Sequence, residues 1–239
     1  MNYHVVTFDS LPSTNQYIKD HYMTLPHKSV IVATHQTSGR GRFHRSWIDV
    51  AGTNLLCSIL LKETCFTYPV EQCSLVGALS VAKTIDKYCD NDIKWPNDIL
   101  IHHRKVAGIL LEAVSTSSLE AVIVGIGINV NQSQFAPELS HKATSLAQVI
   151  THPIDPMQLL DELLVHFDEQ YERLQRGTFS LSDYEKRLKT LNQLVTYQGK
   201  TYRARAIDDS GALVLEGDEG MRTISSGEVE YLNLYETDF

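Results

Sequence analysis

Three arginines and two glycines are interleaved in one stretch of the chain, Gly39-Arg40-Gly41-Arg42-Phe43-His44-Arg45-Ser46-Trp47. Glycine lets a backbone approach an anion closely, and arginine guanidinium groups match phosphate and carboxylate oxygens. The stretch therefore predicts an anion-binding loop. It lacks the Gly-Lys-Ser/Thr ending of a phosphate-binding P-loop and the third glycine of a dinucleotide fingerprint. A solvated surface loop, or one that grips a nucleic-acid backbone, is an equally open interpretation.

A lysine, an amide and a carboxylate lie close together in Lys94-Trp95-Pro96-Asn97-Asp98. Proline and an Asn-Asp pair favour turns, so a purely structural turn is one interpretation of this segment. The other is chemical, because Mg²⁺ in nucleotide sites takes few protein carboxylates and adds phosphate and water oxygens. The segment is therefore a candidate site for a magnesium–nucleotide complex.

A lysine also opens the apolar segment Lys105-Val106-Ala107-Gly108-Ile109-Leu110-Leu111-Glu112, after a predicted hairpin turn at His103-Arg104. Lysine is seldom buried without a partner, and Gly108 leaves room for a ligand against the backbone. The structural alternative is a lysine whose ammonium group reaches solvent from the strand end. Further on, the glycines of Gly125-Ile126-Gly127 are a weak signal, because glycine in a strand equally indicates a β-bulge.

Small polar residues occupy Ser13-Thr14-Asn15, between a predicted strand at residues 3–8 and a short helix running toward His21. Their side chains can cap the helix N-terminus, which is the more frequent role of such residues. Three small polar groups at a strand–helix junction also suit recognition of a compact polar ligand. Helix capping and ligand recognition are therefore both predicted roles of this segment.

The hydrophobic pattern of the rest of the chain predicts the strands and helices that position these groups. Strands are predicted at residues 29–34, 53–61 and 119–128, with an amphipathic helix at 70–88 that covers a sheet face. Apolar residues from Met157 to Leu174 form a helical stripe interpreted as core packing, and a second helix is predicted from Ser180 through Leu188. Hairpin-linked strands favour an antiparallel or mixed sheet over a doubly wound one. From about Leu194, closely spaced turn signals predict a small β-barrel docked on the main domain.

Composition is that of a globular protein able to fold without covalent staples. The chain has 239 residues, of which 43% are hydrophobic, so one main domain with a small appendage is expected. Cys57, Cys65, Cys73 and Cys89 form no Cys-x-x-Cys pair and have no histidines at ligand spacing, which indicates reduced, mostly buried thiols and a cytoplasmic location. The formal charge of −8 opposes general nucleic-acid binding. Neither a signal segment nor a membrane span is evident in the pattern.

Taken in this order, the motifs closely resemble those of the biotin protein ligase family. The resemblance covers residues 3 to about 150, and the terminal β segment is similar to the family's SH3-like domain. It implies an α+β fold, with a mixed, largely antiparallel sheet of the class II synthetase-like type flanked by helices, and a C-terminal SH3-like β-barrel. The expected domains are residues 1–190 and 191–239. Some members carry an N-terminal winged-helix domain that binds DNA, but only about a dozen residues precede Ser13, too few for such a domain, so the ligase-only form is expected.

The resemblance also implies an ATP-dependent activity in two steps. Biotin and MgATP give biotinoyl-5′-AMP and pyrophosphate, and a lysine of an acceptor protein then attacks the mixed anhydride. Lys105, Arg40 and Arg42 are the expected catalytic residues, acting by charge rather than as nucleophiles. The expected biotin site consists of Ser13, Thr14, Asn15, Gln36, Gly39, Arg40, Arg42, Lys105, Gly108, Ile109 and Gly125. The expected nucleotide site consists of Arg42, Arg45, Trp47, Lys94, Asn97 and Asn129, with Asp98 as the candidate Mg²⁺ ligand.

The implied acceptor is the biotin carboxyl carrier domain of a biotin-dependent carboxylase, bound by a monomer or homodimer without DNA or membrane. Lipoate protein ligase is the nearest alternative, since it shares the architecture and the adenylate chemistry. A nucleic-acid-binding module that uses the arginines is an alternative from another class. The terminal barrel could also be an independent interaction module, although its size favours a docked subdomain.

Overall fold

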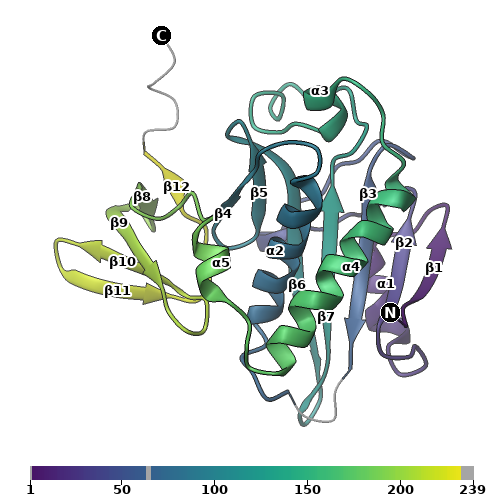
Figure 1. Cartoon of the computed structure of the whole chain (residues 1–239), viewed down its shortest axis with the longest axis horizontal. Helices are drawn as coiled ribbons and strands as arrows, with labels where there is room; N and C mark the ends of the chain where they lie inside the picture. Colours follow the sequence, from purple (N-terminus) through teal and green to yellow (C-terminus); the bar gives the residue numbers. More distant parts are fainter. Residues whose placement is uncertain (1, 63–65, 233–239) are drawn as a thin grey trace.

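The computed structural model describes residues 2–62 and 66–232, which build two sheets (Figure 1). The larger sheet has the strand order β1-β2-β3-β7-β6-β5-β4, in which only β1 and β2 are parallel. Its strands are β1 (His4–Phe8), β2 (Ser29–Ala33), β3 (Leu55–Leu61), β4 (Asp92–Lys94), β5 (Asp98–Ile101), β6 (Arg104–Ser115) and β7 (Leu119–Ile128). The predicted mixed, largely antiparallel sheet is confirmed.

Helices cover both faces of this sheet (Figure 1). Alternate strand residues point to opposite faces, so Ile123 packs in a cluster with Ile18 of α1 (Thr14–His21), while Val122 and Val124 face the main core. The main core lies under α2 (Gln72–Ile85) and α4 (Pro156–Gln175). Because α4 packs on α2, most of α2 is buried, and the predicted amphipathic helix has little solvent-facing surface.

Two helical predictions need correction. Met157 was expected in the buried stripe of α4 but is 40% exposed; the buried residues of this helix begin with Leu159 and Leu160. The helix expected through Leu188 is α5 (Leu181–Glu185), which ends earlier. The reason is tertiary, because the Ile93 amide donates to the Arg187 carbonyl and the Lys189 amide donates to the Ile93 carbonyl, at 2.8 and 2.9 Å. These bonds draw residues 187–189 into an extended pairing with β4.

The smaller sheet is antiparallel, with the order β11-β10-β9-β8-β12. Its strands are β8 (Leu194–Tyr197), β9 (Lys200–Ile207), β10 (Leu213–Gly217), β11 (Gly220–Ile224) and β12 (Glu230–Tyr231). Val195, Leu213 and Val229 belong to the same buried cluster as the main core, so this sheet is docked as expected. The division at residue 190 stays a prediction. A further short helix, α3 (Leu146–Ile150), lies above the large sheet in Figure 1.

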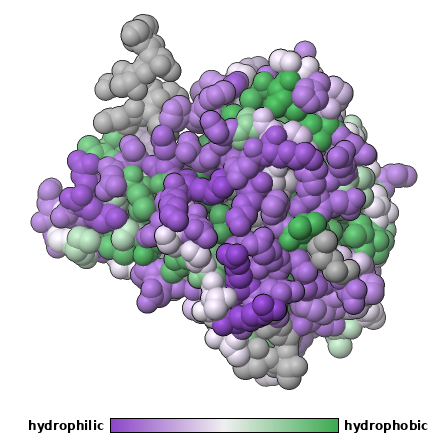
Figure 2. All heavy atoms as spheres, in the orientation of Figure 1, coloured by the Kyte–Doolittle hydropathy of each residue, from purple (hydrophilic) through white to green (hydrophobic). Residues whose placement is uncertain are grey.

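The molecular surface and the burial of the cysteine side chains can be compared with the globular fold and mostly buried thiols that the composition predicts. The face seen in Figure 2 is mostly hydrophilic, with hydrophobic residues in separate patches, including one over the smaller sheet. The side chains of Cys57 and Cys73 are buried and that of Cys89 is half-buried, whereas Cys65 lies outside the described residues. Burial raises the pKa of the Cys57 thiol to about 12. Within the described segments, no helix combines the length and the apolar character that a membrane span requires.

Candidate active site

A cavity of about 790 Å³ lies over strands β6 and β7, beside the arginine loop (residues 39–47). It brings together all but one of the residues that the sequence singled out for binding or catalysis. They are Ser13, Thr14, Asn15, Gln36, Arg40, Arg42, Arg45, Trp47, Lys94, Asn97, Asp98, Lys105, Gly108, Ile109, Gly125 and Asn129. Gly39 is the exception: it is buried beside the cavity, where a Cβ atom would lie 2.6 Å from the Trp47 carbonyl oxygen. The roles assigned to these residues stay predictions.

Three glycines form the floor of the cavity. Gly108 of β6 pairs with Gly127 of β7, and Gly125 lies two residues before Gly127 on the same face. A Cβ atom at Gly125 would lie 2.3 Å from Asn15 Oδ1, and one at Gly127 would lie 2.7 Å from Trp47 Cζ2. The pairing of β7 with β3 and β6 runs without a shift through these glycines. Their role is therefore close approach of side chains to the backbone, and the bulge interpretation is wrong.

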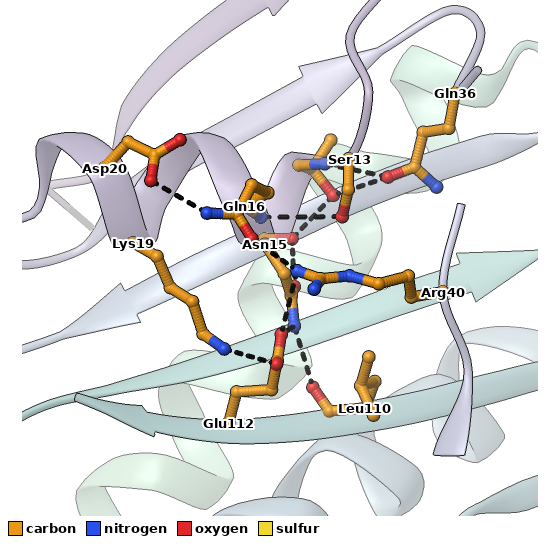
Figure 3. A network of polar contacts seen from close by, with 11 residues as sticks. Ser13, Asn15, Gln16, Lys19, Asp20, Gln36, Arg40, Leu110 and Glu112 are labelled. Atoms are coloured by element: carbon orange, nitrogen blue, oxygen red, sulfur yellow. Dashed lines mark hydrogen bonds and ion pairs between the residues drawn. The ribbon is translucent and has the colours of Figure 1, made fainter. Parts of the chain in front are cut away.

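Hydrogen bonds fix the start of α1 against this floor (Figure 3). The Ser13 hydroxyl accepts from the Gln16 amide at 3.5 Å, so the predicted helix cap is confirmed. Gln36 Oε1 accepts from the Thr14 amide at 2.8 Å. The buried Ser58 hydroxyl lies 2.5 Å from Asn15 Oδ1 and 2.6 Å from Thr14 Oγ1. These polar groups are held rigidly at the cavity wall, which suits recognition of a ligand with defined donors and acceptors.

The carboxylate of Glu112 joins this network from β6 (Figure 3). Glu112 Oε2 accepts from Asn15 Nδ2 at 2.7 Å, and Oε1 pairs with Lys19 Nζ at 2.5 Å. Arg40 Nη2 lies 3.9 Å from the same carboxylate and donates to Gln16 Oε1 at 2.9 Å. Burial alone raises the pKa of Glu112, but the hydrogen bonds and charges of these partners outweigh it, so its pKa lies below the ordinary value. Glu112 is therefore ionised and orients both Asn15 and Arg40.

The three arginines of the loop reach three different parts of the molecule. Arg40 bonds α1, whereas Arg42 Nη1 donates to Asn97 Oδ1 in the β4–β5 turn at 3.3 Å. Arg45 Nη1 donates to Glu228, two residues before β12 of the smaller sheet, at 2.8 Å. Burial lowers the pKa of Arg42, and the charges of Asp98 and Glu228 partly oppose this, yet a guanidinium remains charged at neutral pH. The loop thus carries positive charge across the mouth of the cavity.

The turn between β4 and β5 confirms the structural interpretation of residues 94–98 and leaves the chemical one open. Lys105 Nζ pairs with Asp98 Oδ1 at 2.6 Å and lies 5.6 Å from the centre of the Trp47 ring, so this lysine has a carboxylate partner. Within residues 2–62 and 66–232, no three His, Cys, Asp or Glu side chains cluster as a metal cage would need. A single carboxylate fits Mg²⁺ only where phosphate and water oxygens supply the other ligands.

A buried polar atom at the site has no hydrogen-bond partner in the part of the chain that the structure describes. The indole Nε1 of Trp47 is buried and makes no hydrogen bond, although its ring lies over Gly108 and Gly127. A buried donor without an acceptor is costly, by about 1–3 kcal/mol. The atom therefore points to a ligand acceptor in the cavity.

Several residues of the site were not predicted from the sequence, two of them in the polar network around Asn15 and the others in the cavity lining. Ser58 could have been noticed as a polar residue inside the apolar run of β3, and Glu112 as a carboxylate in a half-buried strand. No local signal marks the others, which come from the segment after β7 and from residues 227–231, at and just before β12. They are Phe135, Glu138, Leu139, Lys142, Ala143, Gly227, Glu228, Glu230 and Tyr231.

Comparison with protein families gives two matches along the chain. Residues 7–129 match the family described as "Biotin/lipoate A/B protein ligase family". Residues 194–231 match the family described as "Biotin protein ligase C terminal domain". The first match contains both the arginine loop and the glycine floor, and the second contains the strands of the smaller sheet.

Comparison with individual proteins agrees with these matches. The chain is 34% identical to "Bifunctional ligase/repressor BirA" of Bacillus subtilis (strain 168), over 96% of this chain and 74% of the relative. It is 32% identical to "Biotin--[acetyl-CoA-carboxylase] ligase" of Paracoccus denitrificans, over 83% of this chain and 88% of the relative. Among solved structures, it is similar to a biotin protein ligase from Aquifex aeolicus in complex with biotin and ATP. The TM-score is 0.83 and the identity 28%, over 95% of this chain and 97% of that one.

Proposed function

This chain belongs to the biotin/lipoate A/B protein ligase family, and on that premise we propose that it is an ATP-dependent biotin protein ligase. It joins biotin and ATP into biotinoyl-5′-AMP, with release of pyrophosphate. It then transfers the biotinoyl group to a lysine of a biotin carboxyl carrier domain, with release of AMP. Relatives named for biotin and acetyl-CoA-carboxylase support this choice of substrate and acceptor over lipoate.

The observation that carries the proposal is the gathering of cations over a glycine floor. The chain has a formal charge of −8, yet Arg40, Arg42, Lys94 and Lys105 all line the one cavity. In the first step the biotin carboxylate attacks the α-phosphate, and the bond from phosphorus to the pyrophosphate oxygen breaks. Because both reactants are anions, fixed positive charges lower the barrier by offsetting their repulsion and the charge on the transferring phosphoryl group.

Biotin occupies the part of the cavity beside α1. Its ureido group needs a few fixed donors and acceptors, which Ser13, Thr14 and Gln36 supply, and its ring system and tail need apolar walls such as Ile109. Gly125 and Gly108 let Asn15 and Lys105 lie close to the strands, where both side chains line the part of the cavity that receives the ligand. Arg40 leaves its contacts with Gln16 and Glu112, or shares them, to meet the biotin carboxylate.

The nucleotide occupies the other part of the cavity, toward the β4–β5 turn. Arg42, Arg45, Lys94, Asn97 and Asn129 face the phosphates and the nucleoside, and Trp47 Nε1 donates to a ligand oxygen. Asp98 holds the Mg²⁺ that accompanies ATP, and the ion supplies charge neutralisation at the phosphates when it is bound. Lys105 exchanges its pairing with Asp98 for the carboxylate and α-phosphate oxygens of the reactants.

In the second step, the acceptor lysine amine attacks the acyl carbon of the mixed anhydride. The bond from the acyl carbon to the phosphate oxygen breaks, AMP leaves, and the amine loses a proton as the amide forms. No side chain of the enzyme becomes acylated. The ligase domain is assigned to residues 1–190 and the C-terminal domain to residues 191–239.

Mass spectrometry of the protein mixed with biotin and MgATP tests the proposal. A mass for biotinoyl-5′-AMP, and exchange of labelled pyrophosphate into ATP that depends on biotin, are the expected results. A matched reaction with lipoate in place of biotin is the control. Exchange with lipoate and none with biotin would replace the proposed substrate, and exchange with neither would refute adenylate chemistry.

A further inference from the structure

Lys94 is a cation of the cavity whose contact is with an aromatic ring and not with a carboxylate. Arg45 pairs with Glu228 and Lys105 pairs with Asp98. Within the described residues, the Lys94 ammonium makes no hydrogen bond or ion pair, and its one polar contact is with an aromatic face. Its Nζ lies 5.1 Å from the centre of the Tyr231 ring, within the range of a cation–π interaction.

Tyr231 belongs to β12 of the smaller sheet, 137 residues after Lys94, and it too lines the cavity. Its hydroxyl lies 2.9 Å from the Oγ1 atom of the fully buried Thr190. The same Oγ1 atom accepts from the Trp95 amide at 2.9 Å. Trp95 is the residue after Lys94, so one threonine fixes both the aromatic ring and the backbone that carries the lysine.

An aromatic ring orients a cation without neutralising it. A carboxylate at the same place would hold Lys94 more tightly, but it would compete with an incoming phosphate for the ammonium group. The face of a tyrosine ring attracts the cation through its quadrupole and leaves its three N–H donors free. A cation fixed in this way binds an anion with little loss of side-chain freedom.

We propose that Tyr231 is a positioning residue that holds the Lys94 ammonium group ready for the phosphates of the nucleotide. The smaller sheet thereby supplies part of the nucleotide subsite rather than only a docked module. The inference rests on the proposed ligase function, and it adds to it the element that orients one cation. Thr190 has a supporting part, because it fixes the tilt of the ring.

The test compares Tyr231→Leu, which removes the ring, with Tyr231→Phe, which keeps it. The measured quantities are the dissociation constants for MgATP and for biotin, by calorimetry, and the KM for ATP in biotin-dependent pyrophosphate exchange. We expect Tyr231→Leu to weaken MgATP binding roughly tenfold, the size of a partly desolvated cation–π contact, and Tyr231→Phe to weaken it at most about twofold. Biotin affinity should stay within about twofold in both variants.

A double-mutant cycle separates positioning from packing. Lys94→Met removes the cation, so Tyr231→Leu should cost almost nothing further in the Lys94→Met background. The matched control is Tyr88→Leu, which removes a ring 5.7 Å from the Lys87 ammonium, outside the cavity. It should leave MgATP binding unchanged. Melting temperatures of all variants report on folding, and Tyr231→Met replaces Tyr231→Leu if the latter is unstable.

Equal losses in Tyr231→Leu and Tyr231→Phe would overturn the inference, because the ring would then not matter. The same loss from Tyr231→Leu with and without Lys94 would overturn it as well, since the tyrosine would then act only through packing. A wild-type protein that neither binds MgATP nor forms the adenylate would refute the proposed function itself. That result differs from the first two, which require an active wild type.

Discussion

Adding one methyl group at Gly125 or at Gly127 should have different consequences, although the two glycines lie on the same face of β7. At Gly125 the new Cβ would meet Asn15 Oδ1 at 2.3 Å. Asn15 is 3% exposed and is held by Ser58 at 2.5 Å and Glu112 at 2.7 Å, so it cannot move without breaking buried hydrogen bonds. At Gly127 the Cβ would meet Trp47 Cζ2 at 2.7 Å, but Trp47 lies on the arginine loop and its indole Nε1 makes no hydrogen bond.

The expected magnitudes follow from these contacts. Overpacking costs about 1–3 kcal/mol, a lost buried hydrogen bond adds about 1 kcal/mol, and replacing glycine in a strand returns about 0.5–1 kcal/mol. For Gly125→Ala the net loss is about 2 kcal/mol, which lowers the melting temperature by about 4–8 °C for a chain of this size. For Gly127→Ala the arginine loop can shift to relieve the contact with Trp47, so the melting temperature should fall by less than about 2 °C. The displaced Trp47 should weaken ligand binding about tenfold.

Thermal unfolding without ligand and calorimetric binding of biotin and MgATP measure the two effects. Gly125→Ala should be the less stable variant, and Gly127→Ala the stable one with impaired binding. Equal melting temperatures for the two variants, or unimpaired binding by Gly127→Ala, would show that the side chains above the floor are not held as the contacts indicate.

Three further predictions concern the charged residues around the cavity. Arg42→Gly should retain the adenylate less well, because a charge at the cavity mouth is lost; biotinylation of bystander amines should rise, and tight retention would contradict this. Glu228→Gln breaks the ion pair with Arg45, which is 2.6 Å long, so amide exchange at residues 39–47 should quicken without ligand and slow when biotinoyl-5′-AMP binds. Equal exchange rates in the wild type, the variant and the ligand-bound protein would show that neither the ion pair nor the ligand orders this loop. Glu112→Gln tests whether the charge of Glu112 stabilises the fold. The pKa of Glu112 is lowered in the folded state. The ionised carboxylate therefore adds to the free energy of unfolding above the unfolded pKa of about 4.3, and this contribution is lost as the pH falls through the folded pKa. The variant should be less stable than the wild type at pH 7, and the difference in free energy of unfolding should shrink toward pH 3; a difference independent of pH would refute the charge argument.

The sequence by itself determined the local features of this protein. Ser13 caps α1, as its residue type predicts. The β4–β5 turn lies at the proline and Asn-Asp pair, and the β5–β6 turn lies at the histidines. Strands β4, β5, β6 and β7 pair with their neighbours in sequence as antiparallel hairpins. Such features depend on residues a few positions apart, so the pattern of side chains is sufficient to predict them. The arginine loop and the glycines could also be selected, because few roles require these residues together.

Tertiary structure decided how the pieces combine into a site. Glu112 lies 97 residues from Asn15, and Tyr231 lies 137 residues from Lys94, so no local pattern could link them. The sheet order decides these meetings, since β7 lies between β3 and β6 and thereby brings Ser58, Gly125 and Leu110 into adjacent register. Long-range pairing also explains two of the corrections to the local predictions. The bonds from Ile93 to Arg187 and Lys189 end α5 before Leu188. The regular pairing of β7 with β3 and β6 leaves no bulge at its glycines. Hydrophobic burial fixes this order over the whole chain at once, which is why it is read from the folded molecule and not from any one segment.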